Sequence, residues 1–167
     1  MNWEDKEQVK KGNIGENIVD QYFEGRGYII YKPVTNAAHL IDRLYVKDKK
    51  KLIFADTKTK AKRNKYPDTG FDYKHYKDYQ MLQDMGLEVW IFFVDEVEAI
   101  VYGNTLEKLS EPQIVHHEGK TIKYPLRWGE IIYFYRKSMI DISLLSVEEV
   151  SEIKSHNTRN YDYEIHG

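Results

Sequence analysis

The stretch LIDRLYVKDKKKLIFADTKTK, residues 40–60, decides the expected fold. It holds two apolar segments, 40–46 and 52–58, separated by a lysine-rich turn. In both segments apolar side chains recur at alternate positions, which is typical of strands that bury one face. We therefore expect an antiparallel β-hairpin that turns about Lys49.

The register of this hairpin follows from its apolar residues. Pairing Leu44 with Phe54 sets apolar side chains opposite each other, and the same register sets Asp42 opposite Asp56. Directly opposed Cβ atoms lie about 4.5–5.5 Å apart, so two carboxylates would meet where both cannot ionise cheaply. A divalent cation relieves that repulsion, and oxygen ligands favour Mg²⁺ or Mn²⁺.

Lys58 lies two residues beyond Asp56, on the same face of the expected strand. A lysine there can contact an attacking water or a phosphoryl oxygen, so that metal and lysine stabilise charge growing on phosphorus. This pattern indicates phosphodiester hydrolysis. The alternative is that Lys58 only neutralises one of the two carboxylates in an ion pair on an exposed sheet face.

The flanking segments predict the order helix, three strands, helix, strand. Residues 4–26 carry an apolar stripe at helical spacing, residues 28–31 form a short strand, and residues 71–85 predict a second helix before Gly86. Residues 88–94 are continuously apolar, which is typical of a strand buried on both faces.

Glu16 lies at the border of the apolar stripe on the first expected helix. From there its carboxylate can point toward the sheet edge and support a metal shell or a metal-bound water. The alternative is an ordinary solvated glutamate.

The chain of 167 residues is long enough for one domain and short for two. We expect residues 96–167 to extend that domain, mostly as strands, at 99–102, 114–117, 122–124 and 131–135. A helix is expected at 147–154, because Ser146 and Glu149 have the spacing of a capping box.

Composition excludes several classes of protein. With 25 Lys and Arg against 27 Asp and Glu, the chain is not an all-round basic nucleic-acid binder. With no Cys, it has no disulfide framework, zinc ribbon or thiol nucleophile. It has no signal-like start and no apolar run near the roughly 18 residues of a membrane span, so we expect a cytoplasmic protein without a membrane partner.

The near-zero net charge is unevenly distributed. Residues 47–65 carry nine Lys and Arg against two Asp and Glu. Beyond Lys58 the basic residues continue into an aromatic loop that can bind phosphates and stack on unpaired bases, formed by Lys60, Lys62, Arg63, Lys65, Tyr66, Phe71 and Tyr73. The alternative is a solvated loop.

Together, Gly15-Glu16, Leu40-Ile41-Asp42 and Asp56-Thr57-Lys58 resemble the PD-(D/E)xK nuclease superfamily, with a Holliday-junction-resolvase-like core. The resemblance covers about residues 5–95 and departs from the written pattern at Ile41, where the family has Pro. It implies an α/β (α+β) restriction-endonuclease-like fold of αβββαβ order, with a mixed central sheet flanked by helices and a mostly β extension at 96–167.

The resemblance also implies a set of site residues. Asp42, Asp56 and the backbone carbonyl of Thr57 would hold Mg²⁺ or Mn²⁺, Lys58 would assist the attacking water, and Glu16 would support the metal shell. In such enzymes the helix after the third strand often adds a polar residue, for which Gln80 is the candidate.

The function implied is that of a magnesium-dependent endonuclease that hydrolyses DNA, in duplex, branched or single-stranded form. Related nucleases often dimerise so that two sites address two strands, which makes a homodimer a candidate assembly. The alternative is a catalytically silent nuclease-like fold that binds nucleic acid or a protein.

Overall fold

The computed structural model describes residues 6–34, 39–48 and 51–157. In this part of the chain the main sheet has six strands in the order β1-β2-β3-β5-β6-β11. β3 and β5 are parallel and the other neighbours are antiparallel, so the sheet is mixed, as predicted. Its strands are β1 (Ile29–Tyr31), β2 (Arg43–Lys47), β3 (Lys51–Thr59), β5 (Val89–Asp95), β6 (Ile100–Thr105) and β11 (Ile140–Leu144).

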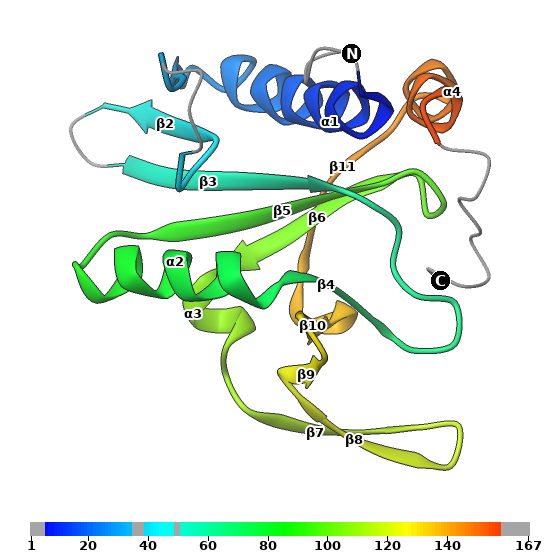
Figure 1. Cartoon of the computed structure of the whole chain (residues 1–167). Helices are drawn as coiled ribbons and strands as arrows, with labels where there is room; N and C mark the ends of the chain where they lie inside the picture. The colour runs from blue at the N-terminus through cyan, green and yellow to red at the C-terminus, as the bar shows by residue number, and fades with distance from the viewer. Residues whose placement is uncertain (1–5, 35–38, 49–50, 158–167) are drawn as a thin grey trace.

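Helices cover both faces of this sheet (Figure 1). On one face lie α1 (Glu7–Glu24) and α4 (Val147–Ser155), and on the other α2 (Tyr73–Asp84) and the short α3 (Leu106–Leu109). Successive side chains of β5 alternate between the two layers: Phe92 joins the cluster under α1, whereas Phe93 joins the cluster under α2. β5 is therefore buried on both faces, which confirms the prediction from its apolar run.

A second sheet lies beyond α2 (Figure 1). It has the order β4-β10-β9, formed by β4 (Asp68–Asp72), β10 (Ile131–Tyr135) and β9 (Leu126–Trp128). Its Phe71 and Phe134 belong to the same buried cluster as Tyr76 of α2. The hairpin of β7 (Gln113–His117) and β8 (Lys120–Tyr124) extends below this sheet, and the 3₁₀ helix η2 (Arg136–Ser138) follows β10.

Residues 96–157 of the expected extension thus contribute to both layers of the fold, and residues 158–167 lie outside the described part of the chain. β11 pairs with β6 in the main sheet, and Ile153 of α4 is buried in the same cluster as Phe23 of α1. The predicted capping box at the start of α4 is confirmed, because Ser146 and Glu149 each accept a hydrogen bond from the other's backbone N–H. In the described residues no helix is long and apolar enough to cross a membrane.

Two expected boundaries were wrong. The helix expected from residue 71 begins at Tyr73, because Phe71 and Asp72 belong to β4, where they pair with β10. Only 3% of Phe71 is exposed, so its ring fills the core and is not placed to stack on bases. The strand expected from residue 40 begins at Arg43.

Close packing of α1 on β3 depends on Gly15. A Cβ atom added there would lie 1.9 Å from Oγ1 of Thr59, too close for any side chain without movement. We expect Gly15→Ala to lower the free energy of unfolding by about 1–3 kcal/mol, measured by urea denaturation. Gly12→Ala on the same helix is the control: its Cβ meets nothing within 4 Å, so a gain of up to about 1 kcal/mol is expected. Equal stability of the two variants would contradict this account.

Candidate active site

The hairpin that decides the fold has the predicted register. Leu44 pairs with Phe54, and the ladder ends where Arg43 pairs with Ala55. Asp42 precedes the first residue of β2, so it does not pair through the backbone with Asp56, and that detail of the prediction was wrong. The reason is local: the chain enters the ladder at Arg43, one residue after Asp42.

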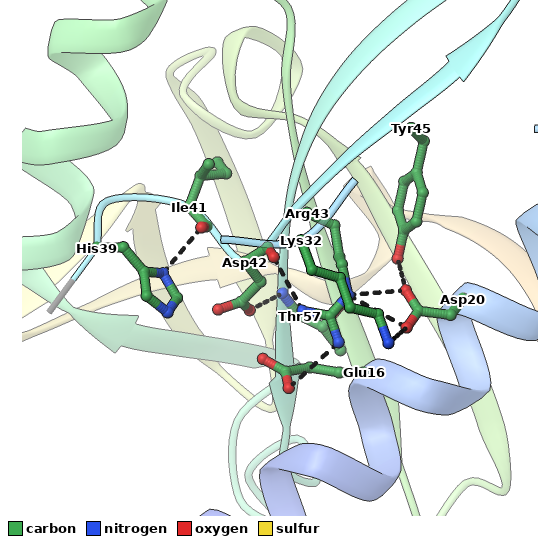
Figure 2. A network of polar contacts seen from close by, with 9 residues as sticks. All are labelled: Glu16, Asp20, Lys32, His39, Ile41, Asp42, Arg43, Tyr45 and Thr57. Carbon is green, nitrogen blue, oxygen red and sulfur yellow. Dashed lines mark hydrogen bonds and ion pairs between the residues drawn. The ribbon is translucent and has the colours of Figure 1, made fainter. Parts of the chain in front are cut away.

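The side chain of Asp42 nevertheless reaches β3. Its Oδ2 accepts a hydrogen bond from the backbone N–H of Thr57 at 3.0 Å (Figure 2). Burial, followed by the charge of Asp56, raises the pKa of Asp42 to about 9. Burial also raises the pKa of Glu16, against the opposing charge of Arg43. Three carboxyl groups therefore gather at the end of the hairpin, two of them with raised pKa values.

Asp56 is the most enclosed of the three, with 4% of the residue exposed. Burial would raise its pKa, but the charge of Lys58 and hydrogen bonds to neighbouring side chains hold the pKa below its ordinary value. The Lys58 Nζ lies 2.7 Å from Oδ2 of Asp56 and donates to the hydroxyl of Tyr79 at 2.9 Å. That hydroxyl donates to the same Asp56 oxygen. The ion pair of the alternative interpretation is thus present, in a largely buried setting.

The contribution of α2 comes from Tyr79, the residue before Gln80. No hydrogen bond joins Gln80 to Asp42, Asp56 or Lys58 in the residues that the structure describes. The sequence places Tyr76 and Tyr79 at helical spacing, typical of core packing, and both are buried. A buried tyrosine usually gives its hydroxyl a partner, and this requirement is the signal that could have identified Tyr79.

A second polar network, not predicted from the sequence, fixes the backbone at Asp42 (Figure 2). The Arg43 guanidinium donates from Nε to both carboxylate oxygens of Asp20, at 3.0 and 3.1 Å, and from Nη1 to the carbonyl of Asp42 at 2.9 Å. Its Nη2 lies 3.7 Å from Glu16. Asp20 also accepts from the hydroxyl of Tyr45 at 2.7 Å. The signal that could have indicated this network is Asp20 itself: it follows Val19 on the buried face of α1, and a buried carboxylate needs a charged or hydrogen-bonding partner.

The basic residues of the loop after β3 make different contacts. Arg63 donates from Nε and Nη2 to both oxygens of Asp68, at 2.6 and 2.7 Å, and its guanidinium lies over the rings of Tyr66 and Tyr133. Its charge is therefore paired inside the protein. Lys62 donates its backbone N–H to Asp95, a buried carboxylate.

The remaining lysines of the loop differ in their exposure. Lys65 is exposed to solvent, whereas Lys60 is partly buried. Burial lowers the pKa of Lys60 to about 8, against the opposing charge of Asp72. Because of its exposure, Lys65 is accessible to a phosphate.

The donor atoms fit a hard divalent cation. Asp42 and Asp56 are adjacent carboxyl groups, and the charge of Asp56 adds to burial in raising the pKa of Asp42. Carboxylate oxygen is the ligand that Mg²⁺ and Mn²⁺ prefer. Among the described residues, no group of three or more His, Cys, Asp or Glu side chains could hold a metal ion. The expected set of two carboxylates and the Thr57 carbonyl falls short of such a group, because one of its oxygens belongs to the main chain.

Comparison with known proteins identifies a similar fold. No protein-family model matches the chain, and a search of curated proteins gives no match. The Holliday junction resolvase Hjc of the archaeal hyperthermophile Archaeoglobus fulgidus is a structural neighbour, with a TM-score of 0.50 and 8% sequence identity. The similarity covers 76% of this chain and 90% of that chain. The mixed sheet and its flanking helices therefore have a nuclease-like fold.

Proposed function

We propose that this protein is a metal-dependent DNA endonuclease of the PD-(D/E)xK type. The observation that carries the proposal is the meeting of Asp42 and Asp56 at the end of the β2–β3 hairpin, with the Lys58 amine 2.7 Å from Asp56. The similarity of the fold to that of a Holliday junction resolvase supports it.

In this proposal Asp42, Asp56 and the Thr57 carbonyl would hold Mg²⁺ or Mn²⁺, with Glu16 in the outer shell. The cation, when bound, stabilises charge on phosphoryl oxygens and lowers the pKa of a water molecule. Lys58 supplies a positive charge beside the attacked phosphate, and Tyr79 holds its amine in place. Arg43 orients Asp42 through the backbone carbonyl next to its own position.

DNA is the proposed partner, held by positive charges beyond the end of β3. Lys60, Lys62 and Lys65 carry that role, with Tyr66 beside them. Arg63 contributes to it less directly, since its guanidinium is bound to Asp68 and packed on two tyrosine rings. A homodimer stays a prediction.

A binding module without catalysis is the second candidate. The ion pair between Lys58 and Asp56 favours it, because that pair already satisfies the acidic oxygen that a metal would use. The two candidates differ in whether a divalent cation displaces Lys58 from Asp56.

Metal uptake distinguishes the two candidates. We expect isothermal titration calorimetry with Mn²⁺ to show binding to the wild-type chain and at least a tenfold loss of affinity in Asp42→Asn, because the variant removes one charged ligand. Asp84→Asn, at the exposed end of α2, is the matched control and should bind as the wild type does. Absence of Mn²⁺ binding, together with absence of cleavage, would favour the binding module.

A further inference from the structure

Trp128 is an exposed aromatic side chain whose position the proposed function does not explain. It ends β9, and 72% of the residue is exposed, more than for any other aromatic residue in the described ranges. Gly129 follows with a φ of +61°, which allows the tight turn into β10. A large ring held at a turn between two paired strands offers a flat apolar face to a ligand.

The neighbouring strands connect this ring to the candidate site. Trp128 pairs with Ile131 of β10, which pairs in turn with Asp72 of β4. With strands about 4.8 Å apart, Trp128 lies roughly 10 Å across the sheet from Asp72. Asp72 shares this face of the sheet, and its charge acts on Lys60, which directly follows β3 and lies two residues beyond Lys58. The distance across the sheet corresponds to about three stacked nucleotides of one strand.

Charge around Trp128 complements a nucleic acid. Residues 113–137 carry five Lys and Arg against two Asp and Glu, although the whole chain is slightly acidic. One of the five, Arg136, is paired with Glu98 and Asp141. The Arg127 guanidinium lies 3.9 Å above the ring of Tyr73, and the Lys120 amine lies 5.1 Å from the ring centre of Tyr66. Basic groups interleaved with aromatic rings are the combination that binds single strands, through phosphate contacts and base stacking.

An exposed indole face favours unpaired nucleotides over continuous duplex as its ligand. Bases in a continuous duplex already stack on their neighbours, so they present edges and phosphates to a protein. An unpaired base has a free face that can stack on an indole ring with little dependence on sequence. The pairing of an exposed ring with nearby positive charge therefore fits unpaired nucleotides.

We propose that Trp128 is a stacking site for an unpaired base of the DNA strand that runs toward Asp42, Asp56 and Lys58. The proposal rests on the proposed function for the direction of that strand. It assigns a substrate preference to the β9–β10 turn: DNA that offers unpaired nucleotides binds more tightly here than continuous duplex.

The test measures binding without cleavage. Fluorescence anisotropy of a labelled 12-nucleotide single strand and a 12-base-pair duplex is recorded with the full chain in EDTA, at one fixed salt concentration. We expect Trp128→Ala to weaken single-strand binding about tenfold and to change duplex binding less than twofold. Trp128→Phe keeps a ring and should stay within about threefold of the wild type.

Leu144→Ala provides the matched control, because Leu144 is 79% exposed on the distant edge strand β11 and should not affect DNA binding. An unchanged single-strand affinity in Trp128→Ala, or an equal loss for single strand and duplex, overturns the proposal. So does a change only in self-association, measured by sedimentation velocity, which would assign the ring to a protein interface. Because no metal is present, failure of metal-dependent cleavage leaves this result unaffected.

Discussion

Replacing Asp56 with asparagine is expected to reduce metal-dependent DNA cleavage by about a thousandfold or more. The substitution keeps the shape of a side chain that is 4% exposed, but it removes the charge that would bind the cation. Asparagine can still accept the hydrogen bond from the Tyr79 hydroxyl, so the fold should persist. Cleavage of labelled single-stranded, branched and duplex DNA is measured at single turnover in Mg²⁺ and in Mn²⁺.

Variants of the two groups that contact Asp56 refine this test. We expect Lys58→Met to lose about a hundredfold or more, because it removes the charge beside the phosphate. Tyr79→Phe should lose about tenfold, since it keeps the charge of Lys58 but removes a hydrogen bond that positions its amine. Lys51→Met, at the exposed start of the same strand, is the control and should cut at the wild-type rate. Full activity in Asp56→Asn or Lys58→Met would refute the assignment.

Replacing Arg63 with alanine is expected to lower the free energy of unfolding by about 3–5 kcal/mol, because a buried carboxylate loses its charged partner. Asp68 is completely buried, and both of its oxygens accept from Arg63. Among the described residues, the hydroxyl of Tyr124 donates to Asp68 at 2.5 Å and would remain as a neutral partner. In a chain of this size the melting temperature should fall by roughly 10 °C, which urea and thermal denaturation can measure.

Lys65→Ala separates this structural role from a contact with DNA. Lys65 is exposed in the same loop, so its removal should change stability by less than about 0.5 kcal/mol and reduce the salt dependence of DNA binding. Arg63→Lys keeps a positive charge but loses the paired geometry and should be intermediate in stability. If Arg63→Ala unfolds with the wild-type midpoint and only weakens DNA binding, the guanidinium faces DNA and not Asp68.

The hairpin could be predicted because its register depends on residues that are close together in the sequence. Alternating apolar residues set the register of Leu44 with Phe54, and the structure confirms that register. β4 could not be predicted in this way: its five residues, Asp-Thr-Gly-Phe-Asp, lack strand-forming periodicity, and they become a strand through pairing with β10. The same pairing explains why α2 starts two residues later than its sequence pattern indicates.

The sequence predicted that three charged residues would lie near one another, and the structure brings them together, but the residues that hold them were not predicted. Asp56 and Lys58 share a face of β3, as alternation along the strand predicts, whereas Asp42 lies just outside β2 and reaches β3 through its side chain. Arg43 and Asp20 meet only when α1 lies on the sheet, 23 residues apart in the chain, and no periodicity encodes that meeting. Tyr79 and Gln80 are neighbours in α2, and their side chains point about 100° apart around the helix. An error of one residue in the expected orientation of the helix therefore decides which of them faces Asp56.

The position of α2 between two sheets has a consequence for the order in which the molecule can fold. β4 is synthesised early, but its partner β10 follows about 60 residues later, and the last strand of the main sheet, β11, comes later still. Phe71 of β4, whose ring lies beside the Lys58 amine, can therefore take its place only after β10 has been synthesised and has left the ribosome. A nascent chain that ends near residue 95 already contains every proposed metal ligand, but it lacks β6, β9, β10 and β11, which complete the two sheets.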